Sequence, residues 1–208
     1  MLKLVIGNRN YSSWSLRPWL ALKQSGLPFD EVPIRLNEAG SKAEILKYSP
    51  SGKVPCLLDG DTLVWDSLAI CEYLAEKSPT LWPTDARQRA EARAISAEMH
   101  AGFTALRQSM PMDIHASKPH DGRGPEVLAD IARIVAIWEG CRARFAAAGP
   151  FLFGAFSIAD AMYAPVAWRF KTYAVDVPPA SQAWIDALCA LPAMQEWQAG
   201  ALAEQAAK

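Results

Sequence analysis

The sequence predicts an α/β domain over residues 1–78 and an all-helical domain over residues 86–208, joined by a linker over residues 79–85. Strand-like and helix-like segments alternate in the first third of the chain, which is typical of an α/β unit. After position 84 apolar residues recur only at spacings of three or four, the period of a helix. Pro79 and Pro83 interrupt the pattern between the two parts.

The first half of the α/β domain is expected to form a strand, a helix and a second strand. Apolar residues alternate over residues 2–6, which is the period of a strand. Residues 16–25 fit a helix that ends at Gly26 and tolerates Pro18 only in its opening turn, because a later proline removes a backbone hydrogen bond. An imperfect alternation over residues 29–36 indicates the second strand.

The second half of this domain is expected to contain a hairpin between two helices. Residues 41–48 begin with the spacing of a capping box and predict a short helix. Residues 54–58 and 62–65 predict two antiparallel strands, because the Asp59-Gly60 pair between them favours a tight turn. A third helix is predicted over residues 66–77, with an Asp-Ser pair that caps its start.

The rest of the chain predicts helices only. Two long amphipathic helices are expected, with residues 111–125 as the loop between them. Ser157 and Asp160 have the spacing of a capping box and predict the start of a further helix, after which shorter helices follow. The two apolar stripes consist of Ile95, Met99, Phe103, Leu106 and Met110, and of Val127, Ile131, Ile134, Trp138, Cys141 and Phe145.

Composition argues against several classes of function. The formal net charge of −1 provides no basic surface for nucleic acid. No apolar run approaches the ~20 residues that span a bilayer, and residues 1–6 carry too little charge for a signal peptide, so a cytoplasmic location away from membranes is expected. The four cysteines never form C-x-x-C and the three histidines have no ligand spacing, so neither a metal site nor a dithiol centre is expected.

Three segments of the α/β domain are candidates for one binding site. Residues 11–15 precede the first helix, whose N-terminus attracts anions. A cis bond at Pro55 would turn the Val54 backbone toward an extended peptide. Asp66 and Ser67 together suit the ammonium and carboxylate of an amino acid. Each segment also has a purely structural interpretation, as helix caps or as a trans proline that ends a loop.

The order and spacing of four motifs resemble the cytosolic glutathione transferase superfamily over nearly the whole chain. The first motif is most similar to the Ser-Ser-Cys-x-x-Arg motif of the serine-type zeta class. The resemblance implies a thioredoxin-like N-terminal domain, a helical bundle as the C-terminal domain, and a homodimer that uses glutathione as co-substrate. The motifs are Ser12-Ser13-Trp14-Ser15-Leu16-Arg17, Lys53-Val54-Pro55, Asp66-Ser67-Leu68-Ala69-Ile70 and Ser157-Ile158-Ala159-Asp160.

The same resemblance implies a role for each matching residue. Ser12 or Ser13 would hydrogen-bond the glutathione sulfur and is the expected catalytic group. Ser157 and Asp160 are assigned to capping, and Arg17 to a structural ion pair. The implied glutathione-binding residues are Trp14, Val54 beside a cis Pro55 for the cysteinyl backbone, Asp66 and Ser67 for the γ-glutamyl head, and Lys42, with Lys53 second, for the glycine carboxylate.

Conjugation of glutathione to small apolar electrophiles, a detoxification reaction, is the expected activity. A serine hydroxyl is too weak a base to deprotonate a thiol, so it would donate a hydrogen bond to the thiolate; lowering the thiol pKa from ~8.5 to ~6.5 takes about 2.7 kcal/mol. Two alternatives are a glutathione-dependent isomerase of the maleylacetoacetate type and a non-catalytic glutathione-dependent ligand carrier. Trp14 and Leu16 depart from the zeta motif, which places the isomerase second.

The electrophile site is expected between the domains, against Met99, Phe103, Arg107 and Met110. The alternative interpretation is that the two methionines and the phenylalanine belong mainly to the core, since they share the stripe of Ile95 and its neighbours. Arg107 would then be a solvated or salt-bridged surface residue.

Overall fold

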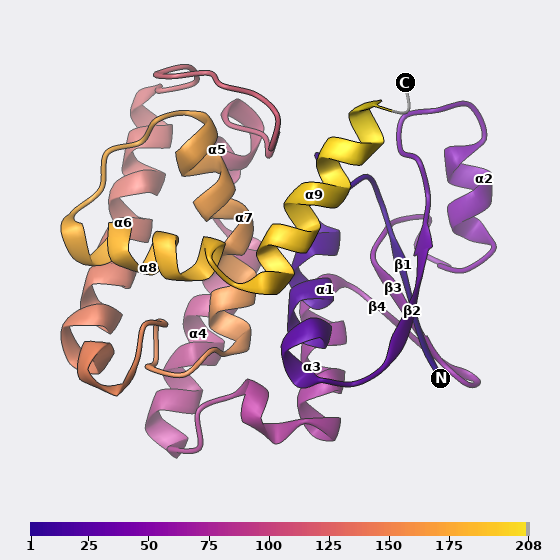
Figure 1. Cartoon of the computed structure of the whole chain (residues 1–208), viewed down its shortest axis with the longest axis horizontal. Coiled ribbons are helices and arrows are strands. Elements are labelled where there is room, and N and C mark those ends of the chain that lie inside the picture. Colours follow the sequence, from indigo (N-terminus) through magenta and orange to yellow (C-terminus); the bar gives the residue numbers. More distant parts are fainter. Residues whose placement is uncertain (207–208) are drawn as a thin grey trace.

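A four-stranded sheet forms the centre of the N-terminal part in the computed structural model, which describes residues 1–206 (Figure 1). The strand order is β2-β1-β3-β4, with β1 parallel to β2 and antiparallel to β3, and β3 antiparallel to β4. The predicted order of strands and helices in this part is confirmed, and it is that of a thioredoxin-like domain. The strands are β1 (Leu2–Ile6), β2 (Phe29–Pro33), β3 (Cys56–Asp59) and β4 (Thr62–Trp65).

Helices cover both faces of this sheet. α1 (Ser13–Ser25) and α3 (Ser67–Lys77) lie on the side of the helical part, and α2 (Ser41–Leu46) lies on the opposite side (Figure 1). Successive side chains of β1 point to opposite faces, so Leu4 packs into the main core and Val5 into a smaller cluster that contains Ile45 of α2. β1 therefore buries apolar side chains on both faces of the sheet, whereas the alternation in the sequence predicted an apolar set on one face.

α1 begins three residues earlier than predicted, which places Pro18 inside the helix. The expectation that Pro18 stands in the opening turn is therefore wrong. The Ser12 carbonyl already accepts hydrogen bonds from the N–H groups of Ser15 and Leu16, so the helix is established before the proline. Pro18 then removes only the N–H that would have reached the Trp14 carbonyl. The helix ends as predicted, at Gly26 with φ 72°.

Within the described residues, helices are the only regular elements of the C-terminal part, as predicted, but the first predicted long helix is two shorter ones. α4 (Ala86–Ala101) ends at Gly102, and Phe103 has a φ of 56°, in the left-handed region. A Cβ on Gly102 would lie 2.8 Å from the Glu98 carbonyl oxygen, so the turn requires glycine there. The helices that follow are α5 (Thr104–Ser109), α6 (Pro125–Phe145), α7 (Ile158–Thr172), α8 (Pro179–Cys189) and α9 (Pro192–Ala206), with short 3₁₀ turns at Pro79–Leu81 and Ala146–Ala148.

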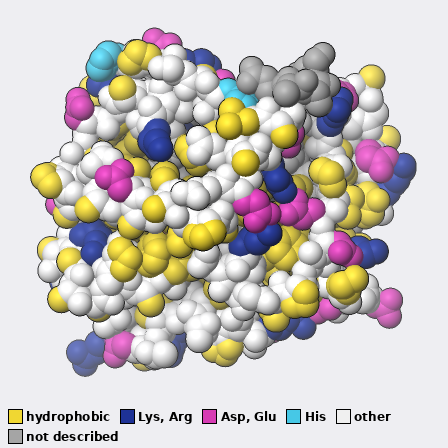
Figure 2. Space-filling view, in the orientation of Figure 1, with side chains coloured by type: hydrophobic (Ala, Val, Ile, Leu, Met, Phe, Trp, Pro, Cys, Tyr) yellow, Lys and Arg dark blue, Asp and Glu magenta, His cyan; other side chains and the backbone are white. Residues whose placement is uncertain are grey.

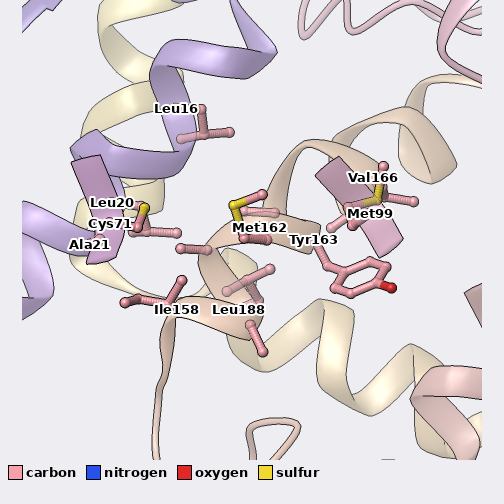
Figure 3. Close-up of a cluster of buried hydrophobic side chains, with 14 of the residues drawn as sticks. Leu16, Leu20, Ala21, Cys71, Met99, Ile158, Met162, Tyr163, Val166 and Leu188 are labelled. Atoms are coloured by element: carbon pink, nitrogen blue, oxygen red, sulfur yellow. The ribbon is translucent and has the colours of Figure 1, made fainter. Parts of the chain in front are cut away.

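One continuous core joins the two parts. α7 is buried along almost its whole length and packs against α1 and α4. Figure 3 shows side chains of α1, α3, α4, α7 and α8 that meet in this core, among them Leu20, Cys71, Met99 and Met162. α9 crosses back over α1, where the Trp197 and Trp19 rings lie 5.0 Å apart (Figure 1). α1 is thus packed against helices of the other part.

The face of the molecule shown in Figure 2 carries positive and negative side chains intermingled. On the face shown in Figure 2, neither Lys and Arg nor Asp and Glu side chains gather into one field. Within residues 1–206 no helix combines the length and the apolar character that a membrane crossing needs. The same residues contain no group of three or more His, Cys, Asp or Glu side chains with the geometry of a metal site.

Candidate functional site

A cavity of about 430 Å³ opens where the start of α1, the turn before β3, the start of α3 and the end of α4 meet. It brings together every residue that the sequence predicted for glutathione binding except Lys42. Ser51, Trp65 and His100 also line it, and the sequence did not predict them for this site. The lining residues are Trp14, Ser51, Lys53, Val54, Pro55, Trp65, Asp66, Ser67 and His100.

The turn before β3 offers unpaired backbone to the cavity. The Val54–Pro55 peptide bond is cis, which confirms that expectation. Neither the N–H nor the C=O of Val54 has a hydrogen-bond partner in the described part of the chain, because the β3 ladder begins only at Cys56. Such an edge can pair with the backbone of an extended peptide, and it supplies one donor and one acceptor.

Asp66 and Ser67 form a polar end to the cavity at the start of α3. Asp66 Oδ1 accepts a hydrogen bond from the Leu68 N–H at 2.9 Å, so the side chain caps the helix, while Oδ2 lies 3.4 Å from His100 Nε2. The backbone of Asp66 has a φ of 73°, in the left-handed region that favours glycine. Ser67 is only 1% exposed, yet its Oγ has no partner among residues 1–206. A ligand with an ammonium and a carboxylate would satisfy both groups.

The two predicted catalytic serines are buried beside the cavity and do not line it. Ser12 is 6% exposed and Ser13 is 7% exposed. Ser12 precedes α1 but its side chain caps no N–H; its Oγ donates instead to Ser15 Oγ at 2.7 Å. Ser13 Oγ accepts a hydrogen bond from Arg169 Nη2 at 3.4 Å. The Ser12 hydroxyl therefore donates its hydrogen bond within the protein, whereas the Ser13 hydroxyl accepts one and can still donate to a ligand.

Trp14 separates the cavity from buried positive charge. The Arg17 Cζ lies 4.2 Å and the Arg107 Cζ 5.4 Å from the centre of its ring system. The predicted structural ion pair of Arg17 is wrong, since its Nε donates to the Met162 carbonyl at 3.1 Å and no carboxylate of the described residues pairs with it. Burial, with repulsion from Arg169 and Arg107, lowers the pKa of Arg17 to about 9.

His100 is the residue through which the helical part reaches the cavity. Its ring meets that of Trp14 edge to face at 5.3 Å. Burial lowers the pKa of His100 below its usual value, although the nearby Asp66 carboxylate opposes this shift, so the imidazole is neutral at pH 7. Its position on α4, next to Met99 of the apolar stripe, was the only sequence signal for it.

Four residues were expected to form the electrophile wall, and none of them lines this cavity. Met99, Phe103 and Met110 are at most 7% exposed and pack in the core, which agrees with the alternative interpretation of this stripe. Arg107 is half-buried and donates to the carbonyls of Met99, His100 and Gly102, so it closes the last turn of α4. It forms no ion pair with a described carboxylate.

Lys53, Trp65 and Lys42 lie at or near the rim of the cavity, but only the first two line it. Lys53 and Trp65 line the cavity, and Trp65 is 47% exposed, which is unusual for so large an apolar side chain. Lys42 is exposed and does not line the cavity; its Cε would lie 3.7 Å from a Cβ at Gly52, so it passes over the turn beside Ser51. An extended ligand that leaves the cavity over this turn would meet Lys42.

Comparisons with known proteins identify both parts of the chain. A model of the glutathione S-transferase N-terminal domain matches residues 11–77, and a model of the C-terminal domain matches residues 86–197. A probable maleylacetoacetate isomerase of Caenorhabditis elegans is 38% identical over 100 residues, which cover 47% of this chain and 46% of that protein. A zeta class glutathione S-transferase of Euphorbia esula is 40% identical over 82 residues, 38% of this chain and 36% of that protein.

The match thus spans less than half the length of each of these two relatives. Among solved structures, a glutathione transferase homolog from Burkholderia gl BGR1, crystallised with bound glutathione, has a TM-score of 0.75 at 22% identity and covers 97% of this chain and 98% of its own. At that identity the likeness shows a common fold.

Proposed function

Since the chain belongs to the glutathione S-transferase family, we propose that the cavity binds glutathione and that the bound thiolate attacks a small apolar electrophile. The observation that carries the proposal is the convergence of three polar groups on one cavity: the unpaired Val54 backbone, the half-exposed Asp66 carboxylate and the buried, unpaired Ser67 hydroxyl. These groups come from two separate turns of the sheet. Together they offer hydrogen-bond partners for both the backbone and the amino-acid head group of an extended tripeptide.

Each group takes one portion of the ligand. The Val54 N–H and C=O pair with the cysteinyl backbone beside Pro55. The Asp66 carboxylate holds the ammonium of the γ-glutamyl head, and the Ser67 hydroxyl donates to its carboxylate. Lys53 at the rim, or Lys42 beyond it, meets the carboxylate at the other end.

The thiol lies toward the start of α1, beside Trp14 and the serines. Between the two serines we assign the sulfur contact to Ser13, because the Ser12 hydroxyl already donates to Ser15. A hydrogen bond from Ser13 and the positive end of the α1 dipole both stabilise the thiolate. The thiol proton leaves to solvent, the sulfur forms a bond to the electrophilic carbon, and the leaving group departs with its electron pair.

A second candidate function is glutathione-dependent isomerisation of an unsaturated diacid, favoured by the similarity to a probable maleylacetoacetate isomerase of C. elegans. In that reaction glutathione adds to the double bond and leaves again after rotation. The two activities separate in a substrate panel that contains a halogenated aromatic and maleylacetoacetate. Faster turnover of the diacid would assign the isomerase, and binding without turnover of either would assign a ligand carrier.

Asp66→Asn tests the binding mode. Asparagine keeps an oxygen for the Leu68 N–H, so α3 stays capped, but it loses the charge that pairs with the ligand ammonium. We expect the Kd of glutathione in titration calorimetry to rise about tenfold, which corresponds to about 1.4 kcal/mol. The exposed Asp61→Asn in the β3–β4 turn is the matched control and should bind as wild type.

A ligand variant completes this test. Glutathione that lacks the α-amino group should bind wild type about as weakly as Asp66→Asn binds glutathione, and Asp66→Asn should not weaken it further. Equal affinity of Asp66→Asn and wild type for glutathione would contradict the proposed placement of the head group.

The assembly and organisation of the chain are also proposals. We propose a homodimer in the cytoplasm, with residues 1–78 and 86–208 as its two domains and residues 79–85 as the linker. The chain has a mass of 22.7 kDa, so light scattering should give twice that value for the dimer. A monomer at micromolar concentration would contradict it.

A further inference from the structure

Three arginines from three helices surround Ser13 and Trp14 without a counter-ion. Arg17 lies on α1, Arg107 on α5 and Arg169 on α7. Arg17 and Arg169 are 0% and 3% exposed, and no carboxylate of the described residues pairs with any of the three. Both terminal nitrogens of Arg17 and Nη1 of Arg169 have no hydrogen-bond partner there either. Burying such charge is costly unless an anion comes close to it.

Arg169 connects this charge to the proposed catalytic serine. Its Nε donates to the Met110 carbonyl at 2.9 Å, which fixes the plane of the guanidinium. Its Nη2 then points at Ser13 Oγ, at 3.4 Å. Burial, with repulsion from Arg107, lowers the pKa of Arg169 to about 10, so the group remains protonated at pH 7.

Resting on the proposed function, we infer that Arg169 is a positioning residue that holds the Ser13 hydroxyl as a donor to the glutathione sulfur and, with Arg17, supplies the positive charge that stabilises the thiolate. A cationic N–H occupies a lone pair of Ser13 Oγ, so the hydroxyl hydrogen points away from Arg169. Because the oxygen accepts from a cation, its own O–H becomes a stronger donor. In this step only the S–H bond breaks, and the proton goes to solvent.

The other titratable groups around the cluster leave its charge largely uncompensated. His100 of α4 is neutral at pH 7, and the buried Cys71 thiol of α3 stays protonated because burial raises its pKa. Asp66, the N-cap of α3, is half exposed and has the smallest effect of the neighbouring groups on the pKa of Arg17. Of the three arginines, Asp130 of α6 affects the pKa of Arg107 alone. Tyr173, beyond α7, is protonated at pH 7 as well, since burial raises its pKa.

The test is the pKa of the bound glutathione thiol, read from the ultraviolet absorbance of the thiolate across a pH series. We expect a value below ~8.5 in wild type, a rise of about one pH unit in Arg169→Gln, and a smaller rise in Arg169→Lys, which keeps the charge but loses the planar fork. Arg142→Gln is the matched control: Arg142 is also buried and donates to the Gly149 and Phe151 carbonyls, without contact to Ser13 or Trp14. It should leave the thiol pKa unchanged.

A double-mutant cycle isolates the path through Ser13. In the Ser13→Ala background, Arg169→Gln should raise the thiol pKa by less than it does in wild type, since the two changes remove one shared contact. An unchanged thiol pKa in Arg169→Gln, or in Arg169→Lys should the glutamine variant not fold, would overturn the inference. Wild type that binds glutathione with an ordinary thiol pKa would overturn it too, whereas wild type that binds no glutathione would overturn the proposed function itself.

Discussion

Asp160→Ala is expected to lower the free energy of unfolding by about 4 kcal/mol. Asp160 is 0% exposed at the start of α7, the helix that joins the two parts of the core. Its Oδ1 accepts hydrogen bonds from the Leu152 N–H at 2.9 Å and from Trp184 Nε1 at 2.8 Å. Its Oδ2 accepts from the N–H of Ser157 at 2.9 Å and from the Ser157 Oγ at 3.1 Å.

Alanine at this position would leave four donors buried without an acceptor, and each such group costs about 1–3 kcal/mol before the chain relaxes. Urea denaturation followed by circular dichroism measures the effect. Asp176→Ala is the control, because Asp176 is exposed in the loop before α8 and should change stability by about 0.5 kcal/mol at most. Similar midpoints for the two variants would contradict a structural role for the Asp160 network.

Capping motifs and turn residues in the sequence correctly predicted the elements that short-range interactions determine. The start of α7 followed from the capping box, which Ser157 and Asp160 do form. The start of α3 followed from the capping preference of Asp66, and the β3–β4 hairpin from Asp59-Gly60. In each case a side chain or a glycine satisfies backbone groups only a few residues away, so a single stretch of sequence contains the whole interaction.

The wrong predictions concern the bounds of helices, where tertiary packing and neighbouring loops determine the structure. The apolar stripe from Ile95 to Met110 keeps a helical spacing across Gly102 because α4 and α5 face the same core, so periodicity alone concealed the break. Pro18 was misplaced because the early turns of α1 are fixed by the loop before it. The first error comes from treating a helical spacing as evidence for one uninterrupted helix, and the second from a predicted start of α1 that is three residues too late.

The residues of the candidate site also fall into those that local sequence predicted and those that only tertiary packing brings together. Val54, Asp66 and Ser67 were predicted because their contributions depend on turns and caps that the sequence specifies. His100 reaches the cavity only because α4 packs beside α3, and the arginine cluster forms only where α1, α5 and α7 converge. Contacts between segments about a hundred residues apart have no pattern in a single sequence, although Arg17 stood within a recognised motif.

Ser13→Ala is expected to lower kcat/KM for glutathione conjugation about 20-fold at pH 7, and Ser12→Ala by much less. Loss of the Ser13 donor raises the thiol pKa from ~6.5 toward ~8.5, so only a small part of the bound glutathione is thiolate at pH 7, whereas the Ser12 hydroxyl donates to Ser15 within the fold. Steady-state kinetics with a halogenated aromatic measures the rates, and calorimetry should show little change in the Kd of glutathione for either variant. The Kd values therefore distinguish a variant that binds glutathione but ionises its thiol less from a variant that binds less glutathione.

The pH dependence gives this prediction its sharpest form. Serine stabilisation holds the thiol pKa low, so wild type should already be ionised near pH 7, and its rate should change little as the pH rises. In Ser13→Ala the thiol pKa returns toward ~8.5, so the rate should climb with pH and the deficit should shrink between about pH 7 and about pH 9, where the thiol ionises without help. A deficit that stays constant from pH 6 to pH 9, or a larger loss in Ser12→Ala, would exclude Ser13 as the group that stabilises the thiolate.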